Sequence, residues 1–470
     1  MTRRLVTSLC VIPLLTACAS LSTQSDVRQA TEQSLPVLPD QWQVDGAEPG
    51  EVQIGWIDQI GDPVLSNLVR EAQLNNRNIQ AAAANVESSW ALVRQARSAL
   101  FPAINGNFNA TRTGRFEGPI PDVSQFDLGA QAQWEVDIWG RVRAGKNAAY
   151  ASAQAVEADF RFAQYSLASA VASAYFTAIE AQLQIGVAER TVSALAEIDR
   201  IVRVRYREGF ASAQDTAITA SDLASAIDSL ENARGAARSS NRALELLLGR
   251  YPANQLTPAS DLPTTPPNPP AGIPSELLER RPDVIAAERR VAAAFANLDQ
   301  ARAARLPLVS LTGSIGGSST DLGDILDGPN LIWSIIGGVL QPIFDGGLRG
   351  AQVEQADADQ RAAVAAYADT ALSALNEAET NLDQAIVLRR RENALDNAAR
   401  ASARAYRLSQ LQYKEGETDL IDVLNIQQRL FNAERGLVTI RRARIEQWVT
   451  LNLALGGSWK ETGTAEQDRE

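Results

Sequence analysis

The sequence contains two copies of one pattern, and this internal duplication limits the possible folds more than any other feature. The motif YREG at residues 206–209 recurs as YKEG at 413–416, and LLLG at 246–249 recurs as LALG at 453–456. Both pairs are 207 residues apart. Two landmarks at one spacing indicate that a structural unit of roughly half the chain occurs twice.

Each copy is predicted to begin with a helix that ends at a proline. The helical stretches cover about 62–100 in the first copy and about 283–304 in the second. Pro102 and Pro307 follow them, 205 residues apart. Proline cannot continue a helix and favours extended backbone before it, so each proline marks a change from helix to strand.

The longest helical runs span about 141–208 and about 348–414, with apolar residues at spacings of three and four. A run of this length forms a rod on the order of 100 Å. Paired rods of this kind are typical of coiled coils. Gly209 and Gly416 end the runs, and a shorter helix follows each glycine.

Two strand-like runs lie between the first helix and the long helix of each copy. The predicted strands are residues 104–113, 126–138, 308–316 and 331–344. In FDLGAQAQWEVDI, residues 126–138, apolar and polar residues alternate. One face of that strand would be apolar and include Trp134, and the other would carry amides and carboxylates.

These strands predict a membrane barrel built by several chains. Four strands cannot close a barrel, and an open sheet edge is not tolerated in lipid. Three chains would supply twelve strands, an even number typical of outer-membrane barrels. We expect the face with Trp134 to meet lipid and the face with Gln131, Gln133 and Glu135 to meet water. A sandwich or hairpin packed on the helices is the alternative that the pattern leaves open.

The fold class is therefore mainly α with membrane β-structure. It has duplicated long helical hairpins, and four strands per chain contribute to a trimeric twelve-stranded barrel. The predicted segments are a signal peptide (1–17), a lipidated extended segment (18–61), a first repeat (62–250), a proline-rich connector (251–274), a second repeat (275–457) and a polar tail (458–470).

The N-terminus predicts export and lipid attachment. Arg3 and Arg4 precede an apolar run, residues 5–15, which is the pattern of a secretory signal. The stretch LTAC at 15–18 resembles a bacterial lipobox, in which Cys18 receives a covalent lipid, with palmitate among its acyl chains, and becomes the mature N-terminus. Ala19 after it favours the outer membrane of a Gram-negative bacterium. An ordinary signal peptide with a chance cysteine is the alternative.

Composition argues against nucleic-acid binding and against catalysis. The formal net charge is −12, whereas phosphate binding needs a concentrated basic face. The chain has no histidine, and its two cysteines lie at Cys10 and Cys18. Triads and the usual zinc sites are therefore excluded from the folded body. Residues 140–147, GRVRAGKN, nearly match a phosphate-binding loop, but Asn147 lacks the hydroxyl that would hold Mg²⁺.

Two motifs carry a resemblance to a known family. WEVDIWGR at 134–141 and ERRPDV at 279–284 resemble hallmarks of the TolC-type outer-membrane efflux family, in its lipoprotein branch (OprM-like or NodT-like). The resemblance extends from the lipobox to about Gly457 and includes both copies. Pro282 and Asp283 suit the first turn of a helix, but this does not explain the two arginines before them.

This resemblance implies a homotrimer whose barrel lies in the outer membrane and continues into a periplasmic α-helical tunnel. It implies the exit duct of a tripartite efflux pump that passes small molecules such as drugs and toxic compounds. The duct would be closed at its periplasmic tip at rest. The implied partners are a periplasmic adaptor (membrane fusion) protein, an inner-membrane RND-type transporter and outer-membrane lipid. Such a duct is no enzyme and holds no cofactor.

The resemblance also implies which residues form the tip of the tunnel. The turns at Gly209 and Gly416 would lie at the periplasmic tip, and together with Tyr206 and Tyr413 they would face the adaptor. Asp422 falls where the family has an acidic ring that faces the pore. The alternative for each turn is an ordinary helix end with a packing tyrosine, and for Asp422 a surface carboxylate.

Asp215 is the counterpart of Asp422 in the first copy and is the second predicted constriction residue. Asn425 stands where some members carry another aspartate, and Thr418 stands where some carry an arginine. The resemblance therefore leaves open whether a second ring exists. Two other functions also remain: a channel for secreted polypeptides, and a trimeric coiled-coil scaffold on the cell surface.

Overall fold

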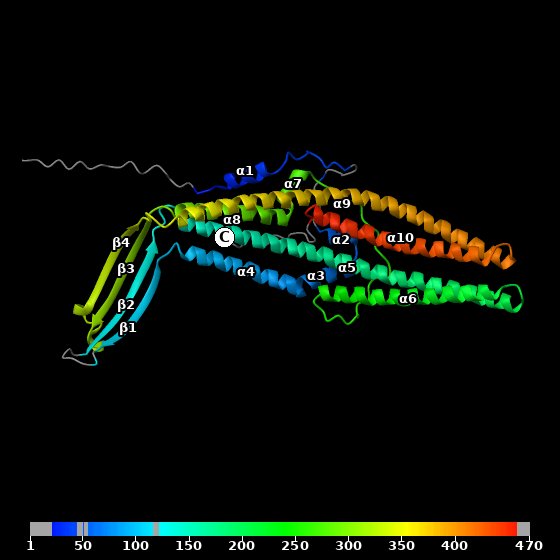
Figure 1. The fold of residues 1–470 in the computed structure, drawn as a ribbon, viewed down its shortest axis with the longest axis horizontal. Coiled ribbons are helices and arrows are strands. Elements are labelled where there is room, and N and C mark those ends of the chain that lie inside the picture. The colour runs from blue at the N-terminus through cyan, green and yellow to red at the C-terminus, as the bar shows by residue number, and fades with distance from the viewer. Residues whose placement is uncertain (1–20, 45–49, 51–54, 115, 117–121, 458–470) are drawn as a thin grey trace, which may run out of the picture. The chain divides into compact units, whose positions relative to one another are not determined.

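The computed structural model describes residues 21–44, 50, 55–114, 116 and 122–457, and this part of the chain is mainly helical with one four-stranded sheet (Figure 1). It divides into two units. The first contains the sheet, helix α1 (Gln24–Ser34) and residues 85–157 and 286–369. The second contains residues 37–84, 158–285 and the chain from 370 onward.

The sheet of the first unit is antiparallel and follows the chain order β1-β2-β3-β4. Its strands are β1 (Ala103–Thr113), β2 (Val123–Glu135), β3 (Leu308–Ser319) and β4 (Leu331–Leu340). Two short 3₁₀ turns, η1 (Leu322–Asp324) and η2 (Gly328–Asn330), lie between β3 and β4. Strands from both sequence copies therefore form one continuous sheet.

Strands β2, β3 and β4 differ in their bounds from the sequence predictions of 126–138, 308–316 and 331–344. Strand β2 begins at 123, where Val123 pairs with Thr113 of β1. It ends at 135, and beyond that end the carboxylate of Asp137 accepts hydrogen bonds from the amides of Val142 (3.0 Å) and Arg143 (2.9 Å). Strand β3 continues to 319, where it still pairs with β2. Strand β4 stops at 340, just before Pro342, which has no backbone N–H to donate.

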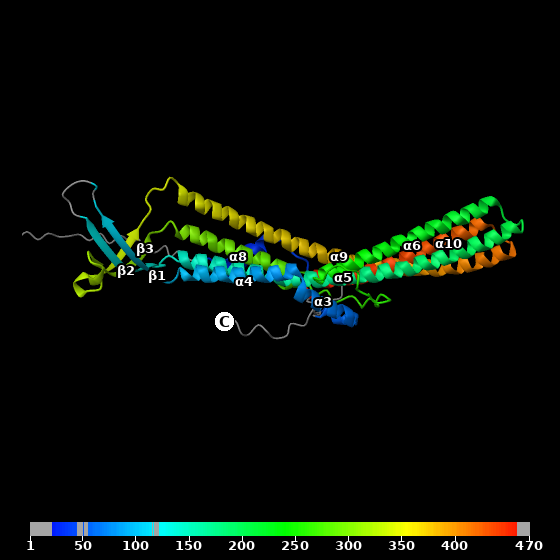
Figure 2. The same cartoon turned by 90° about the horizontal axis from the view of Figure 1, so that it is seen from below.

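The long helices are present in both copies. Helix α5 (Arg141–Arg207) has 67 residues and α9 (Leu348–Glu415) has 68. Each is followed by a helix of 35 residues, α6 (Ala213–Leu247) and α10 (Leu420–Ala454). Figures 1 and 2 show α5 beside α6 and α9 beside α10 in the second unit.

The shorter helices precede the strands and, in the second copy, follow the connector. They are α2 (Trp56–Ile60), α3 (Pro63–Asn75), α4 (Arg77–Ser98), α7 (Pro274–Arg280) and α8 (Pro282–Ala303). The sequence predicted one helix over about 62–100, but Asn76 divides it. Its backbone is extended, and its side chain accepts hydrogen bonds from the amides of Asn78 (2.9 Å) and Ile79 (3.3 Å), so a new helix begins there.

The second unit has a hydrophobic core rich in large aromatic side chains. Trp56 and Trp448 meet edge to face with ring centroids 6.2 Å apart, and both are almost fully buried. Tyr175 and Phe176 of α5 pack in the same cluster. The indole N–H of Trp448 donates to the carbonyl of Pro267 at 2.8 Å, which attaches the proline-rich connector to this core. Among the residues described, no helix is long and apolar enough to cross a membrane.

Candidate functional site

The sheet has an apolar face across all four strands and an opposite face that is polar on β1, β2 and β3, because the strand register places like residues opposite each other. On β1 and β2, Phe108 pairs with Leu128, and Asn107 pairs with Gly129 on the opposite face. The apolar face continues through β3 and β4, where Ile315 pairs with Trp333. Exposed large apolar residues on this face include Ile104, Phe108, Leu128, Leu311, Ile315, Trp333, Ile335 and Val339. A face of this kind cannot remain in water without covering.

The opposite face carries short polar side chains from β1, β2 and β3. Members of this face are Asn105, Asn107, Asn109, Gln131, Gln133, Glu135, Thr312 and Ser314. Strand β4 adds Ser334, whose hydroxyl lies 2.8 Å from that of Ser314. The alternation predicted for residues 126–138 therefore extends across β1, β2 and β3, whereas β4 also places the exposed apolar residues Ile332, Ile336 and Leu340 on this face.

The end of the sheet near α5 is fixed by tryptophans and ion pairs. The indole N–H groups of Trp134 and Trp139 donate to the carbonyls of Leu100 (3.0 Å) and Pro307 (2.8 Å). Arg141 binds the carboxylate of Glu135 through Nε at 2.8 Å and Nη2 at 2.5 Å. This bond, opposed by burial, raises the pKa of Arg141. The WEVDIWGR motif is therefore the joint between a strand and a long helix.

At the far end of the second unit, two equivalent turns connect α5 to α6 and α9 to α10. Gly209 and Gly416 have φ of 83° and 80°, a left-handed conformation that glycine adopts without strain. In both turns the amide after the glycine donates a hydrogen bond to a carbonyl of the preceding helix. The amide of Phe210 donates to the carbonyl of Arg205 (2.7 Å), and the amide of Glu417 donates to that of Gln412 (2.8 Å). The duplicated glycines are thus matched helix ends.

The two tyrosines of these turns have different surroundings, although the same role was predicted for both from the sequence. Tyr206 is 48% exposed, whereas Tyr413 is 8% exposed. The guanidinium of Arg205 lies 4.7 Å from the ring centre of Tyr413 and donates to its carbonyl at 2.8 Å. Burial is the main reason that the pKa of Tyr413 is raised. Of these two tyrosines, only Tyr206 is exposed enough in the single chain to contact a partner.

The two predicted constriction carboxylates also differ. Asp215 accepts from the amide of Ser212 at 2.8 Å, and its own amide donates to the Ser212 hydroxyl at 3.1 Å. This reciprocal pair is a helix capping box. Asp422 is exposed in the first turn of α10, where it accepts a 3.2 Å bond from the hydroxyl of Thr418. The carboxylate of Asp422 is therefore available to ions, while that of Asp215 already has a structural role.

The remaining features predicted from the sequence concern Cys18, Asn425 and metal binding. Cys18 lies outside the described residues. Asn425 is exposed on α10, three residues beyond Asp422. In the described part of the chain, no group of three or more His, Cys, Asp or Glu side chains is arranged to hold a metal ion.

The structure gives a role to Arg281, the more deeply buried of the two arginines of the ERRPDV motif. Its side chain is almost fully buried, yet it forks onto Asp283 with bonds of 3.1 and 2.8 Å. It also contacts Glu377 of α9 at 2.8 Å and the carbonyl of Ala454, the last residue of α10, at 3.2 Å. Burial disfavours its charge, but these two carboxylates raise its pKa overall.

Arg281 therefore fastens the start of α8 to α9 and to the end of α10. Sequence reasoning singled out this arginine without a role, because none of its distant partners could be identified from spacing. Arg280, its neighbour, pairs with Glu276 one helical turn earlier at 3.6 Å.

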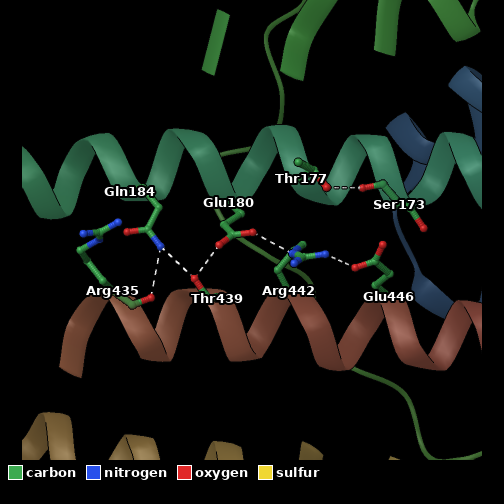
Figure 3. A network of polar contacts seen from close by, with 8 residues as sticks. All are labelled: Ser173, Thr177, Glu180, Gln184, Arg435, Thr439, Arg442 and Glu446. Atoms are coloured by element: carbon green, nitrogen blue, oxygen red, sulfur yellow. Dashed lines mark hydrogen bonds and ion pairs between the residues drawn. The ribbon is translucent and has the colours of Figure 1, made fainter. Parts of the chain in front are cut away.

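A polar network joins α5 to α10 in the middle of the second unit (Figure 3). Glu180 accepts from the hydroxyl of Thr439 and from Nε of Arg442, both at 2.7 Å. Arg442 also bonds Glu446, and Gln184 donates to Thr439 at 3.2 Å. Sequence periodicity alone could not have identified this network, because its members lie about 260 residues apart.

Comparison with known proteins identifies the family. The model of the outer membrane efflux protein family matches residues 68–250 and 273–457. The chain belongs to the outer membrane efflux protein family. The probable efflux pump outer membrane protein TtgC of Pseudomonas putida is 30% identical over 436 residues, which cover 90% of this chain and 89% of TtgC. Outer membrane protein OprJ of Pseudomonas aeruginosa is 32% identical over 427 residues and 87% of each chain.

A solved structure agrees with this assignment. The outer-membrane channel OprN superposes with a TM-score of 0.84 at 27% identity, covering 94% of this chain and 100% of that chain. The TolC-type resemblance and the mainly helical fold class are confirmed. This outer membrane efflux protein is a channel component of an efflux pump, located in the outer membrane of a Gram-negative bacterium and extending into the periplasm.

Proposed function

We propose that three copies of this efflux protein form the exit duct of a tripartite pump for small molecules. The observation that carries the proposal is the two-faced sheet with β1 and β4 at its edges. An edge strand in lipid must be paired, and four strands are too few to close on themselves. Pairing β1 of one copy with β4 of the next gives a twelve-stranded barrel, with the apolar face outward and the asparagine and glutamine face lining the pore.

The long helical hairpins continue this duct into the periplasm, with the turns at Gly209 and Gly416 at its tip. An adaptor contacts the exposed side of the turns, where Tyr206 is open, and links the duct to an inner-membrane transporter. Three copies of Asp422 narrow the pore at rest and favour cations, because each carboxylate is exposed and unfixed by the helix backbone. Asp215 contributes charge to the same constriction from its capping position.

The names of relatives support small molecules as the cargo. TtgC is named as an efflux pump protein, and another relative, from Pseudomonas putida, is named as a toluene efflux pump protein. No enzymatic step and no cofactor enters this function. The duct supplies only a path, and the pump's transporter supplies the energy.

Two measurements test this function. The protein mass of the purified complex in detergent, measured by light scattering, should be three times that of one chain. In a deletion strain, a fluorescent dye that is a substrate of the pump should accumulate, and a plasmid copy should restore its export. A stable monomer in mild detergent, or unchanged accumulation across a panel of dyes and antibiotics, would contradict the proposal.

We also propose that Cys18 carries a covalent lipid that anchors the mature chain. The change Cys18→Ser should abolish palmitate labelling, because no other cysteine follows it in the sequence. Cys10→Ser is the matched control and should leave labelling intact. Labelling that persists in the Cys18 variant would contradict the lipobox interpretation.

A further inference from the structure

The second unit contains two adjoining hollows that the function above does not use. Together they are called the hollow below. They lie between α5, α6 and α10 and measure about 290 and about 470 Å³. Four residues line both of them: Ala188, Ser229, Phe431 and Arg435. Volumes of this size are at the lower end of those that hold drug-sized ligands.

The hollows exist because two helices present small side chains where the third presents large ones. Helix α6 contributes Ser225, Ser229 and Ala236, and α5 contributes Ala181 and Ala188. These positions recur at helical spacing, so they line one face of each helix. The groove between the helices therefore stays open along at least about two helical turns.

The hollow has an aromatic and a cationic group at its centre. The guanidinium of Arg435 lies 5.3 Å from the ring centre of Phe431. Arg435 is exposed, and among the described residues no carboxylate pairs with it. The neighbouring Glu434 instead binds Arg190 of α5 at 3.2 Å. Arg435 is thus held over an aromatic ring with no ion-pair partner in the described part of the chain.

Amide groups surround this centre together with two carboxylates, Glu180, which already binds Thr439 and Arg442, and Asp222. Gln184 donates to the carbonyl of Arg435 (3.1 Å) and to Thr439 (3.2 Å), at the edge of the network in Figure 3. Its Oε1 atom is buried and has no hydrogen-bond partner among the residues that the structure describes. Asn232 and Gln428 line the hollow from the two facing helices. Buried acceptors without partners are costly, so a ligand that donates to Gln184 would be stabilised.

The hollow borders the pore side of α10, a step that rests on the proposed function. Asp422, Asn425 and Asn432 are separated by three and seven residues, close to whole helical turns, and so share one face of α10. Asn425 and Asn432 line the hollow, whereas Asp422 is the predicted constriction. Phe431 and Arg435 follow Asp422 by nine and thirteen residues and so lie on the other side of α10, and the hollow therefore borders the pore side only at its edge, at Asn425 and Asn432.

We propose that the hollow is a binding site for planar aromatic carboxylates moving along the tunnel. Arg435 pairs with the carboxylate, Phe431 packs against the ring, and the amides bind polar ring substituents. A guanidinium fork matches a carboxylate in a plane, and its stacking on an aromatic ring is already present. The site is half open, so binding is weak enough to release the molecule onward.

The test uses 6-hydroxy-2-naphthoate as the probe, because its hydroxyl can donate to Gln184, and the purified trimer, with binding followed by saturation-transfer NMR. Arg435→Gln should weaken binding about two- to fivefold, the upper part of the range for an exposed ion pair. Ser229→Phe should weaken it too, because it fills the hollow while leaving Arg435 in place. Arg429→Gln is the matched control: it removes the same charge from the same helix, outside the hollow.

The outcomes separate the site from the channel. Loss of binding in the Arg435 and Ser229 variants, with the control unchanged, supports the site, even if the trimer conducts no ions. Equal affinity in all variants, or equal binding of 2-naphthylmethylammonium to the wild type, overturns it. In that case, conductance steps from the same trimer would leave the proposed exit-duct function intact.

Discussion

Replacing Arg281 should destabilise the second unit, because its guanidinium joins the start of α8 to α9 and to the end of α10. The change Arg281→Met keeps an apolar stem of similar length but removes the charge that Asp283, Glu377 and the carbonyl of Ala454 share. The Asp283 side chain is 22% exposed and loses both of its bonds to Arg281. The Glu377 side chain is 53% exposed and can return to water.

The magnitude follows from these exposures. Breaking a fully buried ion pair costs about 3–5 kcal/mol, and partial solvent access to Asp283 reduces this figure. The carbonyl of Ala454 adds about 1 kcal/mol when it loses its donor. We therefore expect a loss of about 2–4 kcal/mol. Unfolding entropy for a chain of this length is on the order of 1 kcal/mol per K, so Tm should fall by about 2–4 °C.

The assay is thermal unfolding of the purified protein in detergent at one scan rate, because irreversible unfolding makes Tm depend on the rate. Glu377→Gln is the control for the exposed arm and should shift Tm by less than about 1 °C. A Tm within that margin for Arg281→Met would refute the reasoning. An equal loss in both variants would place the stabilisation in the pair with Glu377 instead.

Two further predictions concern the sheet and the connector. Ile335→Arg, on the apolar face, should lower the stability of the barrel by about 2–4 kcal/mol, whereas Thr312→Arg on the polar face should lower it little. Folding titrations into lipid vesicles would compare the two variants. Equal losses would contradict the assignment of the faces. Glu245 is buried and accepts from three connector amides, which overcome the effect of burial and lower its pKa. Its stabilisation is present above the unfolded pKa of about 4.3 and is lost as pH falls through the lower folded value. The Tm advantage of wild type over Glu245→Gln should therefore shrink between pH 7 and pH 3, and a constant difference would contradict it.

The sequence was most informative where one periodicity controls a long element. The long helices follow from a spacing of 3.6 residues and strand β2 from a spacing of two, and the duplication predicts the matching strands of the second copy. Strand ends were less predictable. Asp137 leaves β2 because it binds the first amides of α5, and an alternating pattern does not contain that competing interaction.

The candidate site shows the same limit more strongly. The duplication made Tyr206 and Tyr413 equivalent, but only Tyr413 packs against Arg205, a residue 208 positions away. The roles of Arg281 and Arg435 depend on which helices meet side by side. Such contacts are set by tertiary packing, which spacing along one chain does not encode.

The central claim is a gated duct whose narrowest point is Asp422, and single-channel conductance in planar bilayers tests it most directly. Wild-type protein should give small, cation-selective steps. Asp422→Ala should give larger steps or lose selectivity, whereas Asp228→Ala, which removes an exposed carboxylate of α6, should behave as wild type. Conductance and selectivity unchanged in the Asp422 variant would contradict the account of the constriction, and no steps from any folded trimer would contradict the duct.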